Sequence, residues 1–127
     1  MSKKILVVED EPDMRQALVE SLSHEGFGVL QAANGGEGLA QALGNYPDLI
    51  ILDILMPKMN GMEMMKKLRQ SGAWGRKVPI ILLTNLSADD KILRGIVEDE
   101  PSYYLVKSDW KIPDVIKKVR EMLERHD

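Results

Sequence analysis

Acidic, hydroxyl and ammonium groups directly follow the short apolar runs of this chain. These positions are Glu9 and Asp10, Asp53, Thr84 and Lys107. If the runs are parallel strands, these groups meet at one sheet edge, where ligands bind in open α/β sheets. Three carboxylates gathered there repel one another unless a hard divalent cation lies between them, and oxygen ligands suit Mg²⁺ or Mn²⁺. A lysine and a threonine suit phosphoryl oxygens. The set predicts a site for phosphate and Mg²⁺.

The apolar runs alternate with longer segments of helical period, which predicts βαβ units around a parallel sheet. The runs are apolar on consecutive residues, as expected of strands covered on both faces. The second run is the least apolar, so we expect it at a sheet edge. Strands are expected at Lys4–Val8, Val29–Ala33, Asp48–Leu52, Pro79–Leu83 and Tyr103–Val106.

The segments between the strands carry helix start and stop signals. Pro12 is suited to a first helical position, and Asn34 with Glu37 three residues later is typical of a capped helix start. Gly26 and Gly44 are expected helix ends. Helices are expected at Pro12–Glu25, from the Asn34 cap through Leu43, at Met62–Gln70, at Ala88–Val97 and at Pro113–Arg125.

Length and composition limit the class of protein. The 127 residues predict one domain, residues 1–127. A net charge of −3 leaves no basic surplus for nucleic acid or an anionic membrane surface. The absence of cysteine excludes disulfides and thiolate sites and is compatible with a reducing cytoplasm. The first apolar run is too short for a signal peptide or a membrane span.

Four segments in order make the resemblance to a known family specific. The chain resembles a response-regulator receiver domain of two-component signalling, similar to the chemotaxis regulators, over essentially its full length. The resemblance implies a flavodoxin-like, doubly wound α/β fold with five parallel strands in the order 2-1-3-4-5 and five flanking helices. The segments are residues 5–11, residues 47–57 with Asn60 and Gly61 after them, residues 80–84 and residues 103–107.

The resemblance implies a role for each acid. Asp53 matches the phospho-acceptor, a nucleophile that takes a phosphoryl group from phosphohistidine and forms an acyl phosphate. Asp10 matches the direct metal ligand, and Glu9 matches its acidic neighbour, which reaches the ion through water. Asp53 and the backbone carbonyl of Leu55 complete the expected ligands of Mg²⁺, or of Mn²⁺ in its place.

The resemblance also implies a switch. Thr84 is expected to donate its hydroxyl to the phosphoryl group, and Lys107 to pair with the carboxylate and the phosphoryl oxygens. Tyr104 matches an aromatic switch position that turns inward once the threonine has moved. The surface that changes is then the helix Ala88–Val97, the strand Tyr103–Val106 and the last helix, through a shift between two existing states.

The sequence departs from the family pattern at a few positions. Ser108 replaces the usual proline after Lys107, and residues 98–101 form an acidic corner in place of a small-residue turn. Leu55 and Leu86 stand where polar residues often tune the lifetime of the phosphate. We hypothesise that these leucines screen the acyl phosphate from water.

Two other functions remain open at this point. One is a receiver-like module that binds proteins without phosphorylation, and the other is a metal-dependent phosphohydrolase with an external substrate. The expected partners of a receiver are a sensor histidine kinase or phosphotransfer protein and an unknown output protein or domain, with no direct nucleic-acid or membrane binding and with catalysis limited to its own phosphorylation and dephosphorylation. The pattern leaves open whether phosphorylation drives homodimerisation and whether the chain stands alone.

Overall fold

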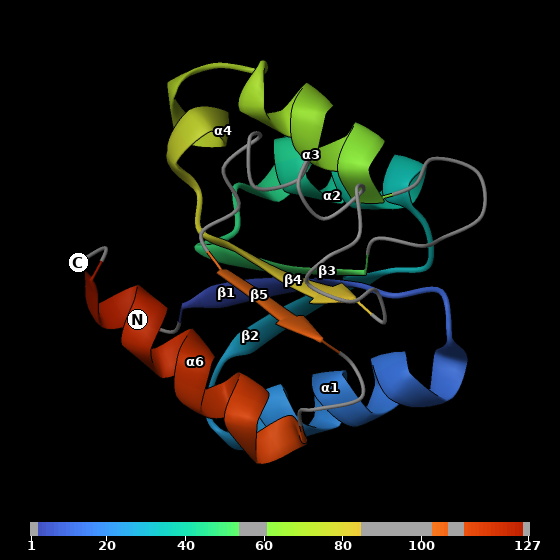
Figure 1. Cartoon of the computed structure of the whole chain (residues 1–127), viewed down its shortest axis with the longest axis vertical. Helices are drawn as coiled ribbons and strands as arrows, with labels where there is room; N and C mark the ends of the chain where they lie inside the picture. Colours follow the sequence, from blue (N-terminus) through green and yellow to red (C-terminus); the bar gives the residue numbers. More distant parts are fainter. Residues whose placement is uncertain (1–2, 54–60, 85–102, 107–110, 126–127) are drawn as a thin grey trace.

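The fold is a five-stranded parallel sheet between two layers of helices (Figure 1). The computed structural model describes residues 3–53, 61–84, 103–106 and 111–125. The strands are β1 Lys4–Val8, β2 Gly28–Ala32, β3 Leu49–Asp53, β4 Ile80–Thr84 and β5 Tyr103–Val106. The helices are α1 Pro12–His24, α2 Gly35–Asn45, α3 Gly61–Arg69, α4 Ala73–Lys77 and α6 Ile112–Arg125.

The strand order is β2-β1-β3-β4-β5, and every neighbouring pair is parallel. This confirms the flavodoxin-like order, and it confirms the least apolar strand, β2, at an edge. Val8 is in register with Leu52, and Asp53 with Leu83. The carboxyl ends of the three central strands therefore lie side by side.

Each face of the sheet has its own apolar core, which explains why the strands are apolar on consecutive residues. One layer of helices is α1 with α6, and the other is α2, α3 and α4 (Figure 1). All five residues of β3 are buried. The α1/α6 core includes Ile5, Val7, Leu18, Leu22, Ile51 and Val119, and the α2/α3/α4 core includes Leu6, Val8, Ala42, Leu52, Met64 and Leu68.

The predicted helix starts are confirmed. Pro12 is the first residue of α1. The Asn34 side chain accepts a hydrogen bond from the Glu37 backbone N–H at 2.9 Å, and the Glu37 carboxylate accepts one from the Ala33 N–H at 2.9 Å. The first contact satisfies an N–H group that the first turn of α2 leaves without a helical partner, and the second binds the N–H that precedes the capping residue.

The end of α1 at Gly26 is confirmed as well. Gly26 has φ +96°, its N–H donates to Ser23 O, and the Phe27 N–H donates to Leu22 O. This pair of bonds is a Schellman motif, which requires a left-handed residue that glycine supplies without strain.

Two expectations about helices were wrong. The second helix does not stop at Gly44 but continues to Asn45, and Tyr46 takes the left-handed terminal position with φ 48°. The short helix α4 was not predicted, because five residues are too few to show an apolar period. The expected helix Ala88–Val97 lies outside the described residues. Within the described ranges, none of the helices combines the length and apolarity needed to cross a membrane.

Candidate functional site

The predicted acids meet at the carboxyl edge of the sheet, between β1 and β3. Asp53 is the last residue of β3, and Glu9 follows the last residue of β1. Because Val8 and Leu52 are register partners, Glu9 and Asp53 leave the sheet side by side. Asp10 follows Glu9 at the start of the turn that leads into α1.

The three carboxylates form a compact cluster. One oxygen from each of Glu9, Asp10 and Asp53 lies within 4.8 Å of the others. Glu9 is 1% exposed and Asp53 is 4% exposed, whereas Asp10 is half-buried. Like charges this close and this poorly hydrated repel each other strongly. The cluster is therefore an arrangement that a cation would stabilise.

The donor chemistry fits a hard divalent cation. All three candidate side chains are carboxylates, which are ligands that Mg²⁺ and Mn²⁺ accept. Oxygens bound to one Mg²⁺ at about 2.1 Å lie at most about 4.2 Å apart. The observed limit of 4.8 Å therefore requires small side-chain shifts or one ligand acting through water.

Arg15 holds the backbone of this acidic turn, a contact that the sequence reasoning missed. Its NH1 donates to the Glu9 carbonyl at 2.9 Å, and its Nε donates to Gln31 Oε1 at 3.3 Å. The Glu9 N–H donates to Ala32 O at 3.1 Å, so both backbone groups of Glu9 are bound. The sequence does show an arginine one turn into the helix that follows Glu9 and Asp10. That pattern does not indicate which group accepts the hydrogen bonds of the arginine.

Of the remaining predicted site residues, the structure describes the backbones of some and leaves others outside the described ranges. Thr84 is the last residue of β4 and is one position beyond Leu83, the register partner of Asp53. Tyr104 lies in β5 in register with Leu82. The backbones of Thr84 and Tyr104 therefore lie at the expected positions of the sheet. Lys107, Leu55, Leu86, Ser108 and residues 98–101 lie outside the described residues.

Comparison with known proteins identifies the family. A model of the response regulator receiver domain matches residues 5–120. The chain belongs to the response regulator receiver family. In this receiver the acid cluster, with Glu9 and Asp53 buried, lies at the carboxyl edge of the sheet.

Individual relatives agree with the family match. The receiver is 34% identical over 122 residues to the response regulator ArlR of Staphylococcus aureus, an alignment that covers 96% of this chain and 53% of that protein. The chain thus spans about half the length of the curated relatives it matches.

Solved structures give the same result for the fold. The receiver is similar to the chemotaxis response regulator CheY4 of Vibrio cholerae, with a TM-score of 0.85, 30% identity and coverage of 95% of this chain and 98% of that chain. It is also similar to the receiver domain of Francisella response regulator 1452, with a TM-score of 0.88, 25% identity and coverage of 99% and 100%. Family membership supports a phospho-accepting role in two-component signalling.

Proposed function

We propose that this receiver accepts a phosphoryl group on Asp53 from the phosphohistidine of a sensor histidine kinase or phosphotransfer protein. The observation that carries the proposal is the buried cluster of Glu9, Asp10 and Asp53 at the strand ends. We further propose that residues 1–127 form one receiver domain that acts in the cytoplasm, catalyses only its own phosphorylation and dephosphorylation, and passes the signal to an output protein or domain.

The chemistry is a substitution at phosphorus. A carboxylate oxygen of Asp53 attacks the phosphorus atom, the new P–O bond forms, and the P–N bond to histidine breaks with its electron pair moving to the imidazole nitrogen. Burial keeps Asp53 poorly hydrated, which leaves its oxygens little water to displace before the attack. Asp53 then carries an acyl phosphate.

The acid cluster requires positive charge for this reaction. Asp10, Asp53 and the Leu55 carbonyl would hold Mg²⁺, with Glu9 acting through water, and Mn²⁺ is the alternative ion. When bound, the ion supplies charge that offsets the negative oxygens of the transferring group. Lys107 adds an ammonium group that pairs with Asp53 and the phosphoryl oxygens.

Signal output is proposed to follow from Thr84 and Tyr104. The Thr84 hydroxyl donates to the phosphoryl oxygens, and the position of Thr84 at the end of β4, beside β3, supports this role. Tyr104 then changes the surface formed by residues 88–97, β5 and α6. Leu55 and Leu86 are proposed to lengthen the life of the acyl phosphate by excluding water.

The experiment is incubation with Mg²⁺ and a small phosphodonor, followed by intact-mass measurement. We expect one added phosphoryl group in the native chain and none in Asp53→Asn. Asp48→Asn is a matched control, because Asp48 precedes β3 at its opposite end and an asparagine oxygen can still accept from the Lys4 N–H. An adduct that persists in Asp53→Asn would place the acceptor elsewhere.

The alternative is a receiver that binds partners without phosphorylation. It predicts no adduct in the native chain with Mg²⁺ and donor, and partner binding that is unchanged in Asp53→Asn. The buried, tightly grouped carboxylates favour the phospho-accepting function, because a docking module has no need to concentrate negative charge in its interior.

A further inference from the structure

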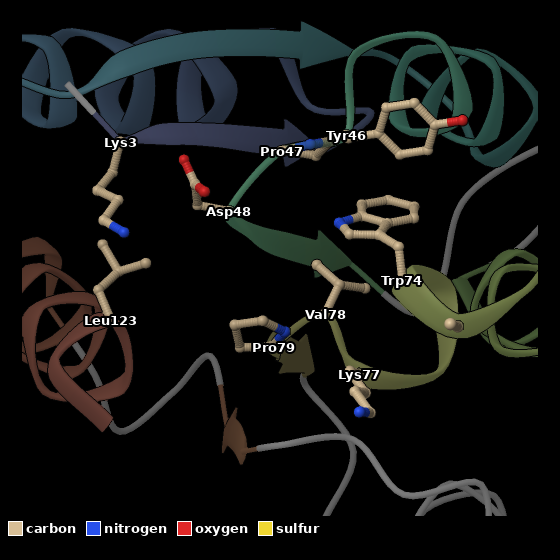
Figure 2. A pocket seen from close by; sticks show the side chains of 10 residues that line it. Lys3, Tyr46, Pro47, Asp48, Trp74, Lys77, Val78, Pro79 and Leu123 are labelled. Carbon is tan, nitrogen blue, oxygen red and sulfur yellow. The ribbon is translucent and has the colours of Figure 1, made fainter. Parts of the chain in front are cut away.

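A hollow at the opposite edge of the sheet is not used by the proposed phosphorylation. Its volume is about 410 Å³, and its lining includes Asp48 and Pro79, which precede β3 and β4 (Figure 2). These strands end at Asp53 and Thr84, so the hollow and the acid cluster lie at opposite ends of the same strands. A five-residue strand separates the two sites by about 16 Å.

One wall of the hollow is aromatic. The rings of Tyr46 and Trp74 meet edge to face, with centroids 5.1 Å apart and an interplanar angle of 88°. In Figure 2, the indole nitrogen of Trp74 is directed toward the middle of the hollow, and the Tyr46 hydroxyl points away from it. Pro47, Val78 and Pro79 supply apolar surface beside the rings. This wall suits the face of a planar, apolar ring.

Tyr46 occupies a backbone position that is costly for a tyrosine. It has φ 48° and ψ 62° at the end of α2, a left-handed conformation that helix ends usually assign to glycine. Its side chain is nevertheless 61% exposed, so burial offsets little of this cost. At this position, the tyrosine places its ring in contact with Trp74 at the hollow.

The Trp74 side of the hollow is held rigidly. Arg69 NH1 donates to the carbonyls of Gly75 and Val78, at 2.9 and 2.8 Å, and so joins α4 to the end of α3. Gly75 lies so close to α3 that an added Cβ would be 2.0 Å from Leu68 O. A preformed wall loses little freedom when a ligand binds, which favours affinity.

The charged groups around the hollow favour an anion. Lys3 and Lys77 line it from different sides, and Asp48 is its acidic lining residue (Figure 2). One Asp48 oxygen accepts a hydrogen bond from the Lys4 backbone N–H at 2.7 Å. The formal charge of these three side chains is +1, from two lysines and one aspartate.

We propose that this hollow is a binding site for a small planar aromatic molecule with one anionic group, such as an aromatic carboxylate. The ring lies against the Trp74 and Tyr46 wall, and the net positive charge of the lysines and aspartate that line the hollow attracts the anion. The volume is within the range of sites for small organic ligands. The site is independent of phosphorylation, because no residue of the acid cluster lines it.

The test is a titration with 2-naphthoate, followed by the indole N–H signals in ¹⁵N NMR spectra. We expect saturable movement of the Trp74 signal, assigned with Trp74→Phe, and a Kd of about 1 mM for a ligand of this size. The neutral analogue 2-naphthalenemethanol should bind about threefold more weakly, because it lacks the charge that the lysines attract.

Single substitutions test whether 2-naphthoate binds at the hollow. Lys77→Gln should weaken 2-naphthoate binding about threefold, whereas Arg76→Gln, an exposed neighbour on α4 outside the lining, should not. Asp53→Asn should bind the probe as the native chain does, which separates this proposal from phosphorylation. Absence of saturable binding, equal binding of the neutral analogue, or equal loss in Lys77→Gln and Arg76→Gln would each overturn the proposal.

Discussion

Arg15 holds the first acid of the cluster through its backbone, because the Arg15 side chain donates to the Glu9 carbonyl and to Gln31 Oε1. A hydrogen bond from a charged donor to a carbonyl is stronger than a neutral one. Because Glu9 and Asp10 are consecutive, fixing the Glu9 carbonyl also limits the backbone of Asp10. Arg15 is therefore a positioning residue for the proposed cation site.

We predict that Arg15→Ala weakens Mn²⁺ binding about tenfold, the usual effect of removing a group that orients metal ligands. Binding is measured directly, by the loss of the free Mn²⁺ signal in electron paramagnetic resonance. Arg15→Lys should recover part of the affinity because it retains a donor. Gln16→Ala is the control, since Gln16 is exposed and its side chain donates to Glu20 of the same helix. Equal affinities of Arg15→Ala and the native chain would contradict the assignment.

Asp53 lies close to two other carboxylates, and a neutral side chain of the same shape tests how this proximity affects stability. We predict that Asp53→Asn raises the free energy of unfolding of the metal-free protein by about 1 kcal/mol, because it removes one of three close, poorly hydrated like charges. The measurement is urea unfolding in the presence of a chelator. Asp48→Asn provides the comparison and should show no such gain. A destabilised Asp53→Asn would mean that the charge is already compensated within the protein.

At the scale of elements, alanine substitutions at two glycines in different helices test how closely α4 packs against α3. An added Cβ at Gly75 would meet Leu68 O at 2.0 Å and Ser71 Oγ at 2.2 Å, whereas one at Gly44 would meet nothing within 4 Å. We predict that Gly75→Ala lowers the free energy of unfolding by about 2 kcal/mol through overpacking. Gly44→Ala should raise it by about 0.5–1 kcal/mol, because Gly44 lies in α2 and alanine is the better helix former.

Urea unfolding measures whether the free energy of unfolding falls in Gly75→Ala and rises in Gly44→Ala. The indole N–H signal of Trp74 adds a second readout, because Trp74 and Gly75 are neighbours in α4. Gly75→Ala should shift that signal, and Gly44→Ala should leave it nearly in place. A Gly75→Ala variant as stable as the native chain would show that α4 can move away from α3 at little cost.

At the scale of the whole molecule, we expect cation binding and folding to be linked. Glu9 and Asp53 approach each other only when β1 and β3 pair, so the unfolded chain lacks the site. We predict that Mg²⁺ at 100 times its Kd stabilises the fold by about 2.7 kcal/mol. For a chain of this length, the thermal midpoint should rise by about 10 °C. The control is a monovalent salt at equal ionic strength, and Asp53→Asn should lose most of the shift.

Much of the architecture was predictable because a two-sided parallel sheet leaves a local signature. Consecutive apolar residues arise where both faces of a strand are covered, and all five residues of β3 are buried as that pattern requires. Strand limits were correct to within one residue: β1 and β5 were correct at both ends, and β3 begins one residue later than expected, at Leu49. Helix ends were predictable where one residue type determines them, as at Gly26.

Other features were not predictable because they depend on residues far apart in the sequence. The end of α2 at Tyr46 was missed because a left-handed tyrosine is favourable only with a partner such as Trp74, 28 positions later. Helix α4 was missed because its five residues are too few to show an apolar period, and the hollow was missed because segments far apart in the sequence line it. Their position depends on the Arg69 bonds to Gly75 and Val78, which no periodicity reveals.

By itself, the sequence determined the alternation of strands and helices, the order of the sheet through its family resemblance, and the acids that end β1 and β3. Local periodicity and residue type are sufficient for these, because each strand carries its own pattern of burial. Only the tertiary structure decided that three carboxylates lie within 4.8 Å, that Arg15 binds the Glu9 carbonyl, and that an aromatic hollow forms at the other edge. Such distances depend on how separate elements pack, and packing between distant segments leaves no local pattern in the chain.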